Sequence, residues 1–246
     1  MDTIKLDNKN VRMIAHRGLS GLEKENTCSA FVAAGNRHTY AGIETDVHRT
    51  SDGQYIIFHD DDTARVAKDS MIIENTTYET LRNLRLLDVD GERGRADLRM
   101  PNLDEYILLC KKYEKTAVLE LKNQFAAADV YKIAARIDKL GWLEHTIFIS
   151  FQLKNLVYLR RRYPDVPAQY LLKETDDTTI ETLRKHNIGL DVRYTAVTPE
   201  LVQAVHAIGQ EINCWTCNTE EEGRALVEMG VDYITTNILE GTNAAR

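Results

Sequence analysis

The chain has 246 residues, of which 43% are hydrophobic and 28% charged, and its net charge is −7. This composition is typical of a soluble globular protein, and the acidic balance argues against non-specific nucleic-acid binding, which needs a basic face. No apolar run approaches the roughly 20 residues that span a bilayer. The first residues, "MDTIKLDNKNVRMIAH", lack the apolar segment of a signal peptide. We therefore expect a cytoplasmic protein without stable membrane insertion.

Eight short runs of strand type alternate with segments of helical periodicity. The runs are 11–15, 42–47, 117–121, 146–150, 168–172, 188–192, 211–216 and 233–236. Alternating strands and helices indicate a parallel sheet, and eight such units indicate an α/β fold of the TIM (β/α)8 barrel type. Since such barrels commonly use about 250 residues, we expect residues 1–246 to form a single domain.

Two of the predicted helices have clear end signals. Thr198 followed by Pro199 is typical of a helix start, and so is the capping-box pattern formed by Thr219 and Glu222. Gly230 is a typical residue at the end of the second helix.

A ninth run of strand type, 55–58, follows the second strand closely. A parallel crossover needs a dozen or more residues, so this run is predicted to turn back as an antiparallel hairpin. Asp52-Gly53 is a preferred two-residue turn, which would place His59 opposite Asp46. Another turn type would shift this register by one or two residues.

The segment from about 63 to 100 is polar, with one helical pattern near 78–87. We expect it to form a short insertion over the barrel, before the third strand.

The carboxyl ends of the predicted strands carry several charged residues, and active sites of TIM barrels lie at that end. Glu44 and Asp46 are two residues apart, so they share one face of the second strand, while Glu120 lies on the third. Carboxylates crowded inside a barrel are unfavourable unless a cation lies between them. Three oxygen donors suit one divalent ion, Mg²⁺ or Ca²⁺. Carboxylates on exposed strand ends are the alternative.

His16 and His59 fall beside these carboxylates and are candidates for a general acid and base. Arg17 and Lys122 are expected to face the same mouth, where a guanidinium and an ammonium would suit a phosphate group. This combination favours phosphoryl chemistry. His48 is expected to be structural.

Cys214 and Cys217, in "CWTC", have the spacing of a redox or zinc motif. No second pair of ligands lies nearby, and on a strand the two side chains would face opposite sides. We expect ordinary reduced thiols.

The motifs "IAHRG", "ENT", "IETDVHRTSDGQYIIFHDDD", "LELK", "CWTCN" and "GVDYITTN" together resemble the glycerophosphodiester phosphodiesterase family, from Val11 to about Asn237. The resemblance implies a TIM barrel that hydrolyses glycerophosphodiesters to glycerol 3-phosphate and an alcohol. It also implies one divalent metal ion, usually calcium or magnesium.

The resemblance implies roles for nine residues. His16 and His59 are the implied acid–base pair. The implied metal ligands are Glu44, Asp46 and Glu120. The residues implied to contact phosphate or to form the wall around glycerol are Arg17, Lys122, Phe151 and Trp215.

Two positions depart from the family pattern. Lys24 stands where proline usually precedes "ENT", and "TTN" followed by Ile238 replaces a commoner "TD-P" ending. Neither departure is expected to touch the catalytic set.

Three other functions are compatible with parts of this pattern. A lysophospholipase D-type phosphodiesterase would need an apolar entrance, and a metal-dependent sugar isomerase or epimerase could use the same fold. A non-catalytic barrel could bind a phosphodiester. The nucleophile, water or the glycerol 2-hydroxyl, stays open, as do the leaving alcohol and the oligomeric state.

Overall fold

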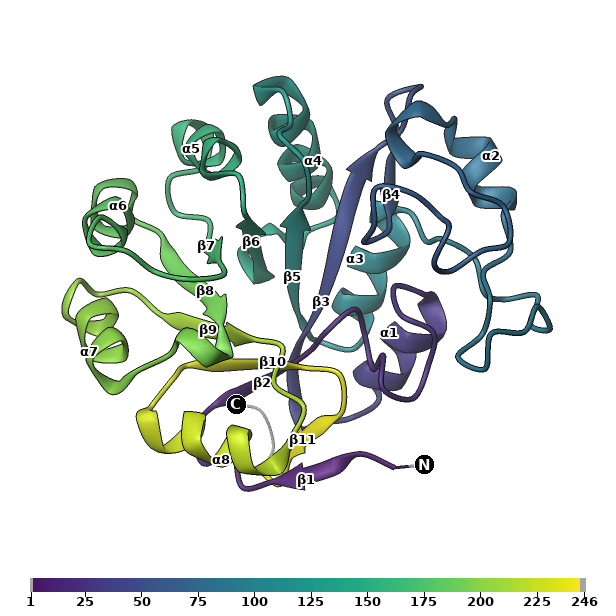
Figure 1. Ribbon diagram of the computed structural model, residues 1–246. Helices are drawn as coiled ribbons and strands as arrows, with labels where there is room; N and C mark the ends of the chain where they lie inside the picture. The colour runs from purple at the N-terminus through teal and green to yellow at the C-terminus, as the bar shows by residue number, and fades with distance from the viewer. Residues whose placement is uncertain (1, 244–246) are drawn as a thin grey trace.

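Eight parallel strands form the centre of the computed structural model, which describes residues 2–243. β2 pairs with both β3 and β10, so the strands close into a ring and confirm the predicted barrel (Figure 1). The ring strands are β2 (Arg12–Ala15), β3 (Tyr40–Arg49), β5 (Thr116–Leu121), β6 (Thr146–Ser150), β7 (Ala168–Leu172), β8 (Gly189–Arg193), β9 (Ile212–Trp215) and β10 (Tyr233–Thr236).

Helices surround the ring of strands (Figure 1). They are α1 (Cys28–Gly35), α3 (Leu103–Lys112), α4 (Ala127–Lys139), α5 (Leu153–Arg162), α6 (Thr179–His186), α7 (Pro199–Ala207) and α8 (Glu220–Met229). Thr198 and Thr219 accept hydrogen bonds from the third backbone N–H of their helices, as predicted. Gly230, at φ 81°, ends α8 in the left-handed region that glycine adopts without strain.

Alternating side chains divide the strands between two apolar clusters. One lies between the barrel wall and the helices, and includes Met13, Ala15 and Phe148. The other fills the barrel interior with Ile14, Val118, Ile147, Ile149, Leu171 and Tyr233. Burial of both faces explains why the strands read as continuous apolar runs.

The predicted hairpin is present, but its turn differs from the prediction. β4 (Tyr55–Ile57) runs antiparallel to the end of β3. Thr50 N–H donates to Gln54 O at 2.9 Å, which leaves a three-residue loop, 51–53, with Gly53 at φ 78°. A type I turn followed by a left-handed glycine is a common alternative to the two-residue turn.

The longer loop shifts the register by one residue. Phe58, instead of His59, lies opposite Asp46, and its N–H donates to Asp46 O at 3.0 Å. The predicted pairing of His59 with Asp46 is therefore wrong by one position.

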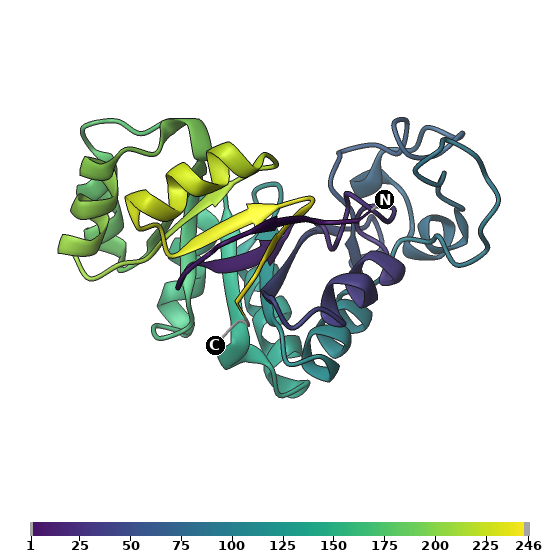
Figure 2. The same cartoon turned by 90° about the horizontal axis from the view of Figure 1, so that it is seen from below.

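The insertion lies beside the hairpin and extends away from one side of the barrel (Figure 2). It contains a 3-10 helix (Ile73–Asn75) and α2 (Tyr78–Asn83), which is shorter than the predicted helix. A small apolar core joins the insertion to the hairpin. It consists of Ile56, Phe58, Val66, Ala67, Ile73, Leu81, Leu84, Leu86, Leu98 and Met100.

A second, two-stranded sheet was not predicted. β1 (Ile4–Leu6) pairs in parallel with β11 (Leu239–Gly241), next to α8 and β2. β11 directly follows β10 in the chain, whereas β9, the ring strand before it, is followed by a helix (Figure 1). No helix within residues 2–243 is both long and apolar enough to cross a membrane.

Candidate active site

A cavity of about 330 Å³ opens at the carboxyl ends of the barrel strands. Eight of the nine predicted site residues line it, and Asp46 lies buried beside it: the eight are His16, Arg17, Glu44, His59, Glu120, Lys122, Phe151 and Trp215. The fold therefore brings the predicted set together from both ends of the sequence.

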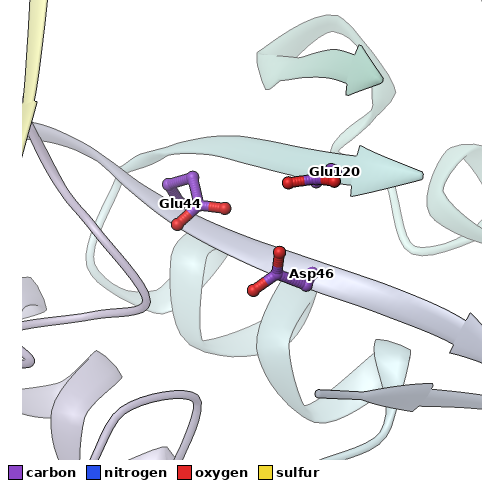
Figure 3. Close-up of side chains that lie close together, drawn as sticks. All are labelled: Glu44, Asp46 and Glu120. Carbon is purple, nitrogen blue, oxygen red and sulfur yellow. The ribbon is translucent and has the colours of Figure 1, made fainter. Parts of the chain in front are cut away.

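Three buried carboxylates form the charged side of this cavity. Glu44 and Asp46 come from β3 and Glu120 from the adjacent β5, where it is the register partner of Asp46 (Figure 3). One oxygen from each lies within 4.8 Å of the other two. Burial and the neighbouring Asp46 charge raise the pKa of Glu44 well above its usual range and that of Glu120 to about 8. The cluster is therefore unfavourable as three anions without a further cation.

The donor set fits a divalent metal ion. Asp46 Oδ1 and Glu120 Oε1 are buried and accept no hydrogen bond among residues 2–243. Lys122 Nζ forms ion pairs with them at 3.5 and 3.1 Å. Since buried carboxylate oxygens are normally paired, these atoms have the chemistry of ligands to a hard cation.

Neighbouring groups fix the other carboxylate oxygens. Arg17, in the left-handed conformation at φ 55°, directs its backbone N–H to Glu44 Oε2 at 2.8 Å. Asn26, in the "ENT" motif, donates to Asp46 Oδ2 at 2.8 Å and accepts from Thr45 at 2.6 Å. Sequence reasoning gave Asn26 no role, although its motif had been noted.

His16 directly follows β2 and lines the cavity beside the carboxylates. Its Nδ1 contacts Asn237 Oδ1 at 2.7 Å, and its Nε2 lies 4.0 Å from Glu44 Oε2. Burial and the charge of Arg17 lower the pKa of His16 to about 4. Asn237 lies in the "TTN" ending, between the two positions that depart from the family pattern, and sequence reasoning gave it no role.

His59 follows the hairpin strand and also lines the cavity. Its Nδ1 contacts Asp60 Oδ1 at 2.5 Å, which orients the ring. Buried His48 contacts the His59 carbonyl oxygen at 3.3 Å through Nε2. His48 lies outside the cavity lining, and its structural role stays a prediction.

The remaining wall of the cavity is largely apolar. The rings of Phe151 and Trp215 meet edge to face, with centroids 5.6 Å apart. Trp215 Nε1 donates to the Asp191 carbonyl oxygen at 3.4 Å, and Ile149 and Leu171 complete the apolar surface.

Residues 16–240 match the sequence model of the glycerophosphoryl diester phosphodiesterase family. The chain belongs to this family. The activity that the family's name states is hydrolysis of glycerophosphodiesters, and the chain is an enzyme of that kind.

Named relatives agree with this assignment along nearly the whole chain. A glycerophosphodiester phosphodiesterase of Bacillus altitudinis is 28% identical over 92% of this chain and 94% of its own length. The crystal structure of one from Parabacteroides distasonis has a TM-score of 0.77 and 26% identity, covering 93% of both chains. A phosphodiesterase of Oleispira antarctica, solved with the product sn-glycerol-3-phosphate, has a TM-score of 0.78 and 25% identity, covering 92% of both chains.

Two further charged residues that line the cavity were missed by sequence reasoning. Lys173 follows the end of β7, and Asp191 lies within β8. Asp191 is buried, and its Oδ1 accepts no hydrogen bond in the part of the chain that the structure describes. A single aspartate inside the apolar run 188–192 was the signal that could have identified it.

The two cysteines of "CWTC" are buried away from the cavity lining. β9 ends at Trp215, so Cys217 lies beyond the strand and the argument from alternating faces does not apply to it. Burial raises the pKa of both thiols, that of Cys217 to about 11, and so disfavours a reactive thiolate. That both are ordinary thiols stays a prediction.

Proposed function

We propose that the enzyme hydrolyses glycerophosphodiesters to glycerol 3-phosphate and an alcohol with one divalent metal ion and with His16 and His59 as acid–base pair. The observation that carries this proposal is the grouping of three buried carboxylates, two histidines and two cations around one cavity. The product bound to the relative from Oleispira antarctica supports the choice of substrate class.

Glu44, Asp46 and Glu120 would hold the metal ion, Mg²⁺ or Ca²⁺. When bound, such an ion supplies positive charge that stabilises the phosphoryl oxygens in the transition state. Arg17 N–H holds Glu44 and Asn26 holds Asp46, so the orientation of these two carboxylates does not depend on the ion.

Arg17 and Lys122 would bind the phosphate. Arg17 Nε is buried and makes no hydrogen bond among residues 2–243, so a donor is free for a phosphoryl oxygen. Lys122 lies on the other side of Asp46 and supplies a second positive charge. Both cations reduce the repulsion between an anionic substrate and the carboxylate cluster.

His16 and His59 would transfer the protons. One removes a proton from the nucleophile and the other protonates the leaving alcohol. Asn237 and Asp60 bind the Nδ1 atoms, so that the Nε2 atoms of both rings are left for this exchange. Phe151 and Trp215 would form the wall against which glycerol packs.

Residues 1–246 would act as one catalytic domain, with the insertion as part of it. The cytoplasmic location stays a prediction from the sequence.

An assay of several glycerophosphodiesters tests this function, with each metal ion added back after chelation. We expect release of glycerol 3-phosphate, its loss in excess chelator, and an unchanged far-UV circular dichroism spectrum, because the carboxylates lie at the barrel mouth. Glu120→Gln should lower kcat by roughly two orders of magnitude or more, whereas Glu200→Gln, on the exposed start of α7, should not. Full activity in chelator would exclude the metal assignment. Turnover of lysophospholipids alone would favour the lysophospholipase D alternative.

A further inference from the structure

Arg65, in the insertion, binds two carboxylates that contact different residues of the proposed active site. Its Nε donates to Asp60 Oδ2 at 2.7 Å, and the other oxygen of Asp60 contacts His59. Its two terminal nitrogens donate to the two oxygens of Glu25, both at 2.7 Å. A single guanidinium therefore binds two carboxylates at once.

Glu25 continues the connection to the phosphate side of the cavity. Glu25 Oε1 also accepts from Arg17 Nη1 at 2.8 Å. Burial opposes ionisation of Glu25, but the hydrogen bonds from Arg65 and the charge of Arg17 lower its pKa to about 2. The result is a continuous chain of contacts from His59 through Asp60, Arg65 and Glu25 to Arg17.

These contacts differ in geometry from isolated surface ion pairs. Isolated exposed ion pairs contribute little to stability, but a bidentate guanidinium–carboxylate contact within a network restricts the orientation of both side chains. The side chains of Glu25 and Asp60 are 21% and 27% exposed and so partly shielded from water, whereas the Arg65 side chain is 48% exposed.

We propose that Arg65 is a positioning residue, which orients His59 through Asp60 and Arg17 through Glu25. This role rests on the function proposed above. It assigns to the insertion a task in catalysis, because Arg65 lies in the insertion. The catalytic histidine and the phosphate-binding arginine are thereby set relative to one another.

Arg95 offers a matched control. It also lies in the insertion and also binds the loop before α1, through Glu23 at 2.7 Å, but Glu23 contacts neither His59 nor Arg17. If Arg65 serves only to attach the insertion, Arg65→Met and Arg95→Met should have equal effects.

The kinetic test compares these two variants on a glycerophosphodiester. We expect Arg65→Met to lower kcat/KM by roughly 10- to 100-fold, since a misplacement of about 1 Å can cost 100-fold. Arg95→Met should stay within about twofold. In an Asp60→Asn background the effect of Arg65→Met on kcat should be smaller, because the contact from Arg65 to His59 is already weakened. In a Glu25→Gln background its effect on KM should be smaller, because the contact from Arg65 to Arg17 is already weakened. Arg65→Lys, which cannot bind both carboxylates fully, should fall between.

A second readout needs no substrate. In ¹⁵N NMR spectra of the histidine side chains, Arg65→Met should change the tautomer and Nδ1 proton exchange of His59, while Arg95→Met leaves them unchanged. Unchanged His59 signals in Arg65→Met, or equal kinetic losses in both variants, would overturn the proposal. A wild-type enzyme that releases no glycerol 3-phosphate, with the His59 change still present, would refute the proposed function instead.

Discussion

Two neutral amides hold ionisable side chains of the site in place. Asn26 binds Asp46, and Asn237 binds His16. An amide oxygen or N–H can orient a charged partner without adding a charge to a site that already contains three carboxylates. Each amide therefore fixes geometry while leaving the charge balance with the proposed metal unchanged.

Replacing Asn237 by leucine should lower kcat by about 10-fold or more, because His16 loses the acceptor that fixes its tautomer and ring orientation. Asn237→Asp keeps an acceptor oxygen and should retain more activity than the leucine variant. Steady-state kinetics of both variants, with thermal unfolding to confirm folding, decide the point. Equal losses in the two variants would show that the contact is not used for orientation.

The main residues of the site could be predicted because they lie in strands whose ends must meet. Glu44, Asp46 and Glu120 needed only the alternation of side chains and the barrel topology. Asn237 could not be predicted in this way, because it reaches His16 from 221 residues further along the chain. Such a contact depends on loop geometry that no local pattern specifies.

At the scale of elements, the hairpin loop is expected to affect catalysis at a distance. Gly53 has φ 78°, and a Cβ there would lie 3.1 Å from the Arg49 guanidinium. Gly53→Val should cost about 1–3 kcal/mol in stability through backbone strain. It should also lower kcat, because the second hairpin strand carries the chain directly to His59.

Gly91→Val is the matched control for this change. Gly91 also has a positive φ, 83°, but it lies in the insertion with no atom within 4 Å of an added Cβ. We expect a comparable loss of stability and no change in kcat. If Gly53→Val lowered stability but left kcat at the wild-type value, the hairpin would not be what positions His59.

The elements themselves were predicted unevenly, for physical reasons. The ring strands are buried on both faces, so their apolar runs predicted the strand boundaries to within about two residues. The hairpin loop is set by side-chain contacts instead. Thr50 Oγ1 accepts from Gln54 N and donates to Asp52, which favours the three-residue loop over the expected turn. The strands of the β1–β11 ribbon are only three residues long and leave no periodic signal.

Across the whole molecule, the active site and the β1–β11 ribbon, which forms a sheet separate from the barrel, are distinct features. Glu240, in β11, is buried and lies outside the cavity lining. Its carboxylate accepts from Thr3 at 2.6 Å and Thr39 at 2.8 Å, and pairs with Arg37 at 3.2 Å and Lys5 at 3.0 Å. This one side chain therefore joins the two ends of the described chain to the segment that leads into β3.

Glu240→Gln should lower the free energy of unfolding by about 1–3 kcal/mol at pH 7, since hydrogen bonds to charged groups contribute about that much. Burial opposes ionisation of Glu240, but its hydroxyl and cationic partners hold its pKa below the usual 4.5. A carboxylate with a lower pKa in the folded than in the unfolded state stabilises the fold above the unfolded pKa. That contribution is lost as the pH falls through the folded pKa. The difference between wild type and Glu240→Gln should therefore be constant from pH 7 to about 5 and shrink below about 4.5.

Urea unfolding of both proteins across this pH range measures the difference, and kcat at pH 7 should be the same in both. Glu200→Gln, at an exposed position, should change stability by less than about 0.5 kcal/mol at every pH. A difference for Glu240→Gln that stays constant down to pH 3 would mean that the ionised carboxylate is not the stabilising form. A parallel loss of kcat would mean that the ribbon and the active site are coupled through the barrel wall.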